Sequence, residues 1–270
     1  MPPPHRNGKL HDPLAGSLFL LESAMLDRSR ESGTRASLEA ANAVAAAYWR
    51  SGRLSDALDL LERTVGDCRA VLGPRDPDTL VAEGNLAVTY ICLEQFQRGL
   101  DLLVANVEAR AAVLGDSHPA TLVARNALAT AYHTADLLPE ALALFAGVAA
   151  QRAHTLGPAH PDALVSRVGL ALTRIDSGDE AGAVSALSSA LQDAEHSVGP
   201  LDELTVTIRS NLAHGHVALG RPDLAHAELE RAAADCQSLL GANHPDTVAL
   251  RTDLALLARE IPRSVEPAES

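Results

Sequence analysis

The sequence is poor in lysine, aromatic residues and cysteine. Lys9 is its only lysine, and aromatic residues make up 3% of the 270 residues. A core with so few aromatic side chains must be built from small and aliphatic ones; because Ala and Leu favour the helix, we expect an all-α protein. The cysteines, Cys68, Cys92 and Cys236, are odd in number and lie far apart. They indicate neither a disulfide framework nor a thiolate zinc site, and they fit a reducing cytoplasm.

Positive charge and long hydrophobic runs are also scarce. The formal net charge is −13 and no basic run occurs, which argues against nucleic acid and anionic membranes as partners. The polar opening MPPPHRNGKLHDP is followed by SLFLLESAML, a short apolar stretch that contains Glu22 and Ser23. This stretch resembles neither a signal peptide nor a membrane span, so we expect a cytoplasmic protein. Heavy use of Ala, Gly, Pro and Arg indicates a GC-rich bacterial genome.

A period of 42 residues runs through most of the chain. An apolar residue followed by Gly recurs at Leu72-Gly73, Leu114-Gly115, Leu156-Gly157, Val198-Gly199 and Leu240-Gly241. The same step relates Asp76-Pro77, His118-Pro119, His160-Pro161 and His244-Pro245. It also relates Tyr at positions 48, 90 and 132, Ala at 57, 141, 183 and 225, and Leu or Phe at 61, 103, 145, 187 and 229. A period of this length indicates stacked supersecondary units.

Each unit contains two helical patterns. The Gly suits the end of one helix, the Pro suits the first turn of the next, and the His or Asp before the Pro is the candidate N-cap. The apolar positions of the second unit form two stripes, namely Leu80, Leu86, Ala87 and Tyr90, and then Leu100, Leu103, Val107, Ala111 and Leu114. One helix pair cannot bury both stripes, so the pairs must stack into a solenoid.

We expect five full helix pairs between about Thr34 and Leu240. Residues Gly16 to Arg30 match a second helix one period earlier, and Pro245 to Glu260 match a first helix, so a half repeat caps each end. The expected domain organisation is a disordered tail at 1–13, a solenoid at 14–260 and a second disordered tail at 261–270.

Several motifs carry a family resemblance. The turns between units read LGPAHPDAL, LGDSHPATL and LGANHPDTV, the triplet NLA begins at Asn85 and Asn211, and the internal turns include SGRLSDAL and LGRPDLAH. These motifs resemble tetratricopeptide repeats (TPRs), in the 42-residue variety of kinesin light chains and many actinobacterial proteins, over nearly the whole chain. Some positions depart from the pattern, since Glu94 and Asp136 replace the internal-turn Gly, and Arg174 and His216 replace the Tyr.

The resemblance implies a right-handed superhelix whose first helices line a concave groove for an extended peptide or a helix of a partner protein. It therefore implies a non-catalytic adaptor or regulatory scaffold without a cofactor. The groove residues that it implies are Asn42, Trp49, Arg50, Asn85, Val88, Ile91, Asn126, Thr130, His133, Leu172, Asn211 and His214.

Several of these residues have a second interpretation. The Asn amides either contact a peptide backbone or hold the neighbouring repeat. Apolar positions such as Val88, Ile91 and Leu172 form either an exposed patch or core. An Arg recurs at Arg125, Arg167, Arg209 and Arg251, where it either binds an acidic partner or pairs with carboxylates of this chain. Trp49 either anchors a ligand or covers the capping helix.

The sequence carries no local motif for catalysis. His214 and His216 are two apart on a helix and point in different directions, so with His226 they indicate no metal site. GxSxG, GxxxxGK[ST] and GxGxxG are absent. Two alternatives to the scaffold stay open. One is a small-molecule binder or atypical enzyme that uses the apolar groove with Trp49, His133, His214 and the recurring arginines. The other is a self-associating scaffold with its own terminus or another copy in the groove.

Overall fold

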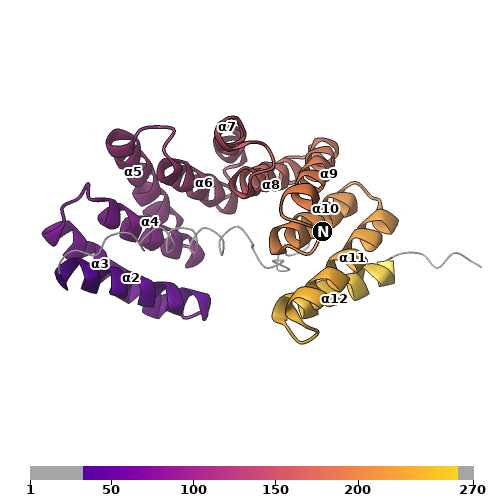
Figure 1. Cartoon of the computed structure of the whole chain (residues 1–270), viewed down its shortest axis with the longest axis horizontal. Coiled ribbons are helices and arrows are strands. Elements are labelled where there is room, and N and C mark those ends of the chain that lie inside the picture. The colour runs from indigo at the N-terminus through magenta and orange to yellow at the C-terminus, as the bar shows by residue number, and fades with distance from the viewer. Residues whose placement is uncertain (1–32, 261–270) are drawn as a thin grey trace, which may run out of the picture. The chain divides into compact units, whose positions relative to one another are not determined.

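The computed structural model of the chain describes residues 33–260, which form eleven α-helices and contain no β-strand (Figure 1). The helices are α2 (Gly33–Arg50), α3 (Leu54–Val71), α4 (Pro77–Cys92), α5 (Phe96–Leu114), α6 (Pro119–Thr134), α7 (Leu138–Leu156), α8 (Pro161–Asp176), α9 (Glu180–Ser197), α10 (Glu203–Ala218), α11 (Pro222–Leu240) and α12 (Pro245–Glu260). The expected tails at 1–13 and 261–270 and the half repeat at 16–30 lie outside the described residues.

Consecutive helices pair as the 42-residue period predicts. The even-numbered helices are the first helices and the odd-numbered ones are the second helices. Four second helices, α3, α5, α9 and α11, each contact both the first helix before them and the first helix after them. The five full pairs, followed by α12 as a half repeat, confirm the prediction of an all-α solenoid of antiparallel helix pairs.

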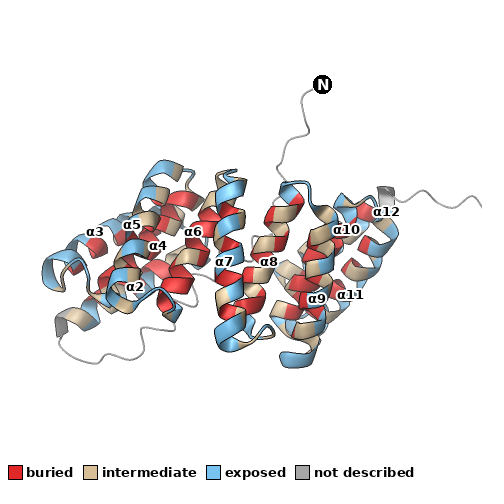
Figure 2. Cartoon of the chain, turned by 90° about the horizontal axis from the view of Figure 1, so that it is seen from above, coloured by how far each residue is buried: buried red, intermediate tan, exposed pale blue. Residues whose placement is uncertain are grey.

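The described residues form two compact units that divide within α7, between Arg152 and Ala153. The first unit contains α2 to α6 with most of α7, and the second contains α8 to α12. Each unit has hydrophobic clusters of its own, in which a second helix packs between two first helices. Figure 2 shows buried residues on the helix sides that meet other helices and exposed residues at the turns.

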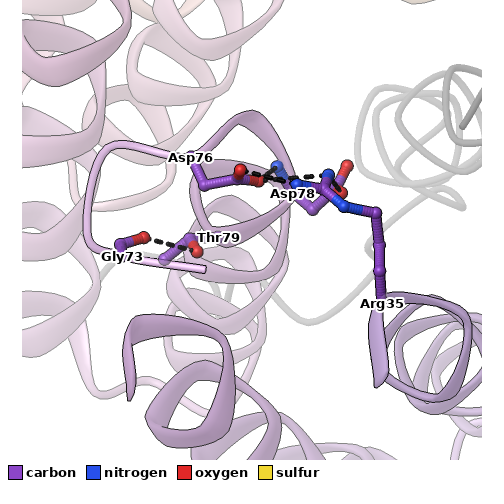
Figure 3. A network of polar contacts seen from close by, with 5 residues as sticks. All are labelled: Arg35, Gly73, Asp76, Asp78 and Thr79. Carbon is purple, nitrogen blue, oxygen red and sulfur yellow. Dashed lines mark hydrogen bonds and ion pairs between the residues drawn. The ribbon is translucent and has the colours of Figure 1, made fainter. Parts of the chain in front are cut away.

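The turns between repeats are held by side-chain caps, of which the sequence predicts those at Asp76, His118, His160 and His244 but not the one at Asp202. The side chain before each helix start accepts a hydrogen bond from the backbone N–H two residues on, at Asp76, His118, His160, Asp202 and His244. Inside the same turn, Thr79 Oγ1 donates to the carbonyl of Gly73 at 2.8 Å (Figure 3). Thr121 and Thr205 make the same contact with Gly115 and Gly199, at 2.8 and 2.7 Å. The repeated residues therefore build one turn several times.

Close helix packing explains the column of small residues. Ala57, Ala141, Ala183 and Ala225 are all fully buried. In the second repeat Gly99 stands in this column, and a Cβ there would lie 2.6 Å from Ile91 Cδ1 and 2.9 Å from the backbone oxygen of Ala87. The first and second helices thus approach too closely for a larger side chain.

Candidate ligand-binding surface

Second helices cover two sides of an interior first helix. On α4, Ala87 belongs to the cluster of Leu103 from α5, while Leu86 belongs to the cluster of Leu61 from α3. A further side of α4 carries the row of Val81, Asn85 and Val88, in which the two valines are half-buried. Asn85 and Val88 of this row are among the groove residues that the family resemblance implies.

The candidate residues of the first unit differ in exposure. Five of them are buried, namely Asn42, Asn85, Ile91, Asn126 and Thr130. Trp49, Val88 and His133 are half-buried, and Arg50 is exposed. Ile91 packs in a core cluster with Leu103, so its position fits the core interpretation of the apolar residues. Binding by any residue of this set stays a prediction.

Two of the candidate asparagines contact each other. The Nδ2 of Asn85 on α4 donates to the Oδ1 of Asn42 on α2 at 2.9 Å, and the two residues are 2% and 4% exposed. An amide pair of this kind satisfies buried polar atoms and joins neighbouring repeats. The geometry therefore matches the inter-repeat interpretation of Asn85.

A small pocket lies beside this amide pair, between α2, α3 and α4. Its lining residues are Leu38, Glu39, Asn42, Cys68, Asp78 and Ala82. Burial raises the pKa of Cys68 to about 11, with a smaller contribution from nearby carboxylates. The pKa of Asp78 is also raised, mainly by burial, and the guanidinium of Arg35 offsets only part of this rise. Because the thiol stays protonated at neutral pH, Cys68 is a buried structural side chain rather than a nucleophile.

Arg35 joins the first two repeats at the edge of this pocket (Figure 3). Its guanidinium pairs with Asp76 at 2.8 Å and also with Asp78, which stand at the start of α4. The hydrogen bond to Asp76 raises the pKa of Arg35. Asp76 also caps α4, so one carboxylate serves the helix end and the contact between repeats.

The second unit presents a different environment to its asparagine. Leu172 on α8 and His214 on α10 are half-buried, and Asn211 on α10 is 8% exposed. The Nδ2 of Asn211 is buried without a hydrogen-bond partner among residues 33–260. Asn211 stands three periods after Asn85, and the position three periods after Asn42 is Val168. A valine cannot accept a hydrogen bond, so the partner that satisfies Asn85 is missing in this repeat.

Arg125, Arg167 and Arg209 of the arginine column pair with carboxylates of this chain, whereas Arg251 donates to the amide oxygen of Gln237 on α11. Arg125 pairs with Asp116, and Arg167 pairs with Asp193 at 2.5 Å. The side chain of Arg209 is only 6% exposed and lies 2.6, 3.3 and 3.6 Å from Glu195, Glu228 and Asp235. The carboxylate contacts fit the ion-pair interpretation of Arg125, Arg167 and Arg209, and among these three Arg209 reaches the adjacent repeat, through Glu195. Binding of an acidic partner by Arg125, Arg167 and Arg209 stays untested.

The second helices also bury polar residues that the repeated motifs do not indicate. Arg110 on α5 is 2% exposed and donates to the backbone oxygens of Leu80 on α4 and Ala120 on α6, at 2.8 and 3.2 Å. It also donates to the Oδ1 of Asn106 at 2.8 Å. Arg152, one period later, is 3% exposed. The signal that could have revealed them is this repetition of Arg after 42 residues, within an otherwise apolar stripe.

His216 occupies the position that Tyr90 holds in the second repeat. The hydroxyl of Tyr90 donates to Glu62 on α3 and accepts from Arg98 on α5, both at 2.6 Å. Burial lowers the pKa of His216, and its Nδ1 has no hydrogen-bond partner among the described residues. The imidazole therefore fills the position without reproducing the polar contacts of the tyrosine.

Residues 33–260 contain no group of three or more His, Cys, Asp or Glu side chains placed to hold a metal ion. Over the same residues, no helix has both the length and the apolar character that crossing a membrane requires.

Family models match much of this helical region. A tetratricopeptide repeat model matches residues 36–103 and 78–146, and a second tetratricopeptide repeat model matches residues 205–246. The chain belongs to the tetratricopeptide repeat family. No curated protein sequence matches this TPR chain.

Solved TPR structures share its fold. A kinesin light chain-like protein of nearly identical TPR-like repeats from Podosopora anserina is 27% identical, with a TM-score of 0.64. The match covers 78% of this chain and 99% of that protein. A thermophilic TPR protein from Thermus thermophilus is 20% identical over 82% of this chain and 99% of its own, with a TM-score of 0.58. BtubC (BKLC) from P. vanneervenii is 16% identical over 80% and 96%, with a TM-score of 0.61.

The TPR fold indicates a protein–protein interaction scaffold, and TPR proteins are generally non-catalytic. In such a scaffold, stacked repeats create an extended surface on which a partner can bind.

Proposed function

We propose that this TPR protein binds an extended segment of another protein along its first helices, and that Asn211 donates a hydrogen bond to the backbone of that segment. The observation that carries the proposal is the buried Nδ2 of Asn211, which has no hydrogen-bond partner among residues 33–260. A buried donor left without an acceptor costs about 1–3 kcal/mol. A carbonyl oxygen of a bound peptide would remove this cost.

The comparison with Asn85 supports this assignment. Both residues begin an NLA triplet on a first helix, but only Asn85 has an amide acceptor, Asn42, in the preceding repeat. In the repeat before Asn211 the corresponding residue is Val168, which is 1% exposed. The second unit therefore has the amide donor of Asn211 but no acceptor for it among residues 33–260. This is the arrangement expected of a site that binds an acceptor from another molecule.

The side chains that share this row suit a peptide. His214, one turn after Asn211, is half-buried, and Val217 is 42% exposed. Asp253 on α12 stands one period after Asn211 and is half-buried, and burial raises its pKa. An amide donor, a carboxylate and apolar surface are what an extended backbone with alternating carbonyl and N–H groups can use.

The test uses peptides selected from a random library displayed on phage, with the full chain as the target. We expect Asn211→Ala to weaken binding of a selected peptide about tenfold, which corresponds to about 1.4 kcal/mol for one lost hydrogen bond. Fluorescence anisotropy with a labelled peptide measures the affinity, and circular dichroism verifies that the variant keeps its helical content.

Asn85→Ala is the matched control, since Asn85 already donates to Asn42. This variant should lower the stability of the fold and leave the peptide affinity within about twofold of the wild type. The proposal fails if Asn211→Ala binds the selected peptides as tightly as the wild type does, or if no peptide is enriched.

A further inference from the structure

The last helix exposes a face that is buried in every full repeat. On α12, Val248 is 49% exposed and Ala255 is exposed. The residues that precede Val248 by whole periods are all at most 8% exposed, namely Leu38, Leu80, Leu122, Leu164 and Val206. Those that precede Ala255 are fully buried, namely Ala45, Ala87, Ala129, Ala171 and Ala213. In these repeats the second helix of the same pair packs against the face, as α3 does against Leu38 and Ala45.

The first described helix, α2, exposes the face that in α4 packs against the second helix of the preceding pair. Val44 on α2 is 46% exposed, whereas its equivalents Leu86, Leu128 and Leu212 are at most 6% exposed and Leu170 is half-buried. Ala40 is exposed, and its equivalent Ala82 is 1% exposed. In α4 this face packs against α3, which is the second helix of the preceding pair.

One second helix covers both kinds of face at once. In α3, Leu61, Val65 and Cys68 form a single cluster with Leu38 and Ala45 of α2 on one side. The same cluster includes Ala82, Leu86 and Tyr90 of α4 on the other side. The exposed faces of α2 and α12 are therefore the two surfaces that one additional second helix would bury.

The sequence places a second-helix pattern before α2. Ala15 and Phe19 stand one period before Ala57 and Leu61, which are both fully buried on α3. After α12 the pattern is not continued, because Pro267 stands where the column of small residues would place Ala or Gly. At this position of α11, the N–H of Ala225 donates to the oxygen of Arg221 at 3.1 Å, and a proline has no N–H to donate.

We propose that residues 14–30 of one copy pack on the exposed face of α12 in a second copy while they contact α2 of their own chain. Each junction then completes a repeat from the first helix of one copy and the second helix of the next, in the register of the 42-residue period. Such a contact joins different surfaces of the two copies, so it links copies head to tail in a ring or an open chain. This proposal is independent of peptide binding.

The test blocks each half of the junction separately in the full chain. Phe19→Asp places a charge in the apolar stripe of the segment, and Ala255→Arg places a long charged side chain on the α12 face, where Ala255 is exposed. Light scattering coupled to size exclusion measures the mass. We expect the wild type to assemble into two or more copies and each variant alone to be monomeric. Because each variant keeps the half that the other lacks, their mixture should form a one-to-one dimer.

Leu224→Arg is the matched control, since Leu224 on α11 is 48% exposed and belongs to neither face. This variant should assemble as the wild type does. A wild type that stays monomeric over a wide concentration range would overturn the proposal. So would assembly of either blocked variant by itself, a mixture that remains monomeric, or loss of assembly in Leu224→Arg.

Discussion

At the residue scale, burial decides what a repeated side chain does. The arginines of one column occupy equivalent positions, but the side chain of Arg125 is 24% exposed beside an Asp116 that is 73% exposed. Arg209 is 6% exposed between carboxylates of α9 and α11. An exposed ion pair contributes little to stability because water screens it, whereas a buried cation among several carboxylates cannot be removed without leaving them uncompensated.

Replacement of these two arginines by methionine separates the effects, since methionine keeps most of the apolar stem. We expect Arg209→Met to lower the free energy of unfolding by about 3 kcal/mol, because it leaves the acidic groups around it without a cation. Arg125→Met should lower it by less than about 1 kcal/mol. Urea unfolding followed by circular dichroism measures both values. Equal effects would show that the heads of the column do not stabilise the fold through burial.

At the element scale, the turn inside each helix pair keeps one backbone shape with changing residues. The turn before the second helix contains a residue with positive φ in all five pairs, at Gly52, Glu94, Asp136, Gly178 and Gly220. Glycine adopts this conformation freely, whereas other residues pay about 1 kcal/mol for it. The packing of the two helices therefore fixes the shape of the turn. Glu94 and Asp136 adopt its positive φ despite the steric cost.

Reciprocal substitutions in this turn should have opposite effects. Glu94→Gly removes the steric cost at a φ of 61°. Glycine also increases the conformational entropy of the unfolded chain, which opposes this gain. The net rise in the free energy of unfolding should therefore be about 0.5 kcal/mol. Gly178→Ala places a Cβ at a φ of 87° and should lower it by about 1 kcal/mol, although no atom lies within 4 Å of that Cβ. Urea midpoints test both changes, and a less stable Glu94→Gly would contradict the strain argument.

At the scale of the whole molecule, stability is the sum of contacts between neighbouring helices. Helices with a second helix on both sides, such as α4 and α10, bury residues around most of their circumference. The helices at the two ends of the described region, α2 and α12, expose Val44, Val248 and Leu256. In a solenoid each unit is held only by its neighbours, so the end helices open more often than the interior ones.

Hydrogen exchange measured by mass spectrometry should show this gradient. We expect amides of α12 to exchange at least about tenfold faster than those of α10, because an opening free energy lower by about 1.4 kcal/mol gives that factor. The assembly-blocked variant Ala255→Arg is the suitable sample, since it keeps the α12 face free. Slower exchange in α12 than in α10 would contradict the nearest-neighbour account of stability.

The sequence by itself determined the repeat, the helix pairs and their caps. These features are local: a Pro in the first turn, a side chain that caps two residues ahead and a stripe at helical spacing act within a few residues of one another. Repetition at 42 residues then reveals the same contacts in successive units. Both the all-α solenoid and the capping role of His118, His160 and His244 were predictable for this reason.

Tertiary structure decided the roles of individual polar side chains. Asn85 and Asn211 begin the same triplet, but the first meets Asn42 of the neighbouring repeat and the second has no partner among the described residues. Arg110 lies in an apolar stripe, and only the approach of two backbone carbonyls shows why a guanidinium is buried there. These outcomes depend on residues of different helices, whose contacts are set by how the helices stack.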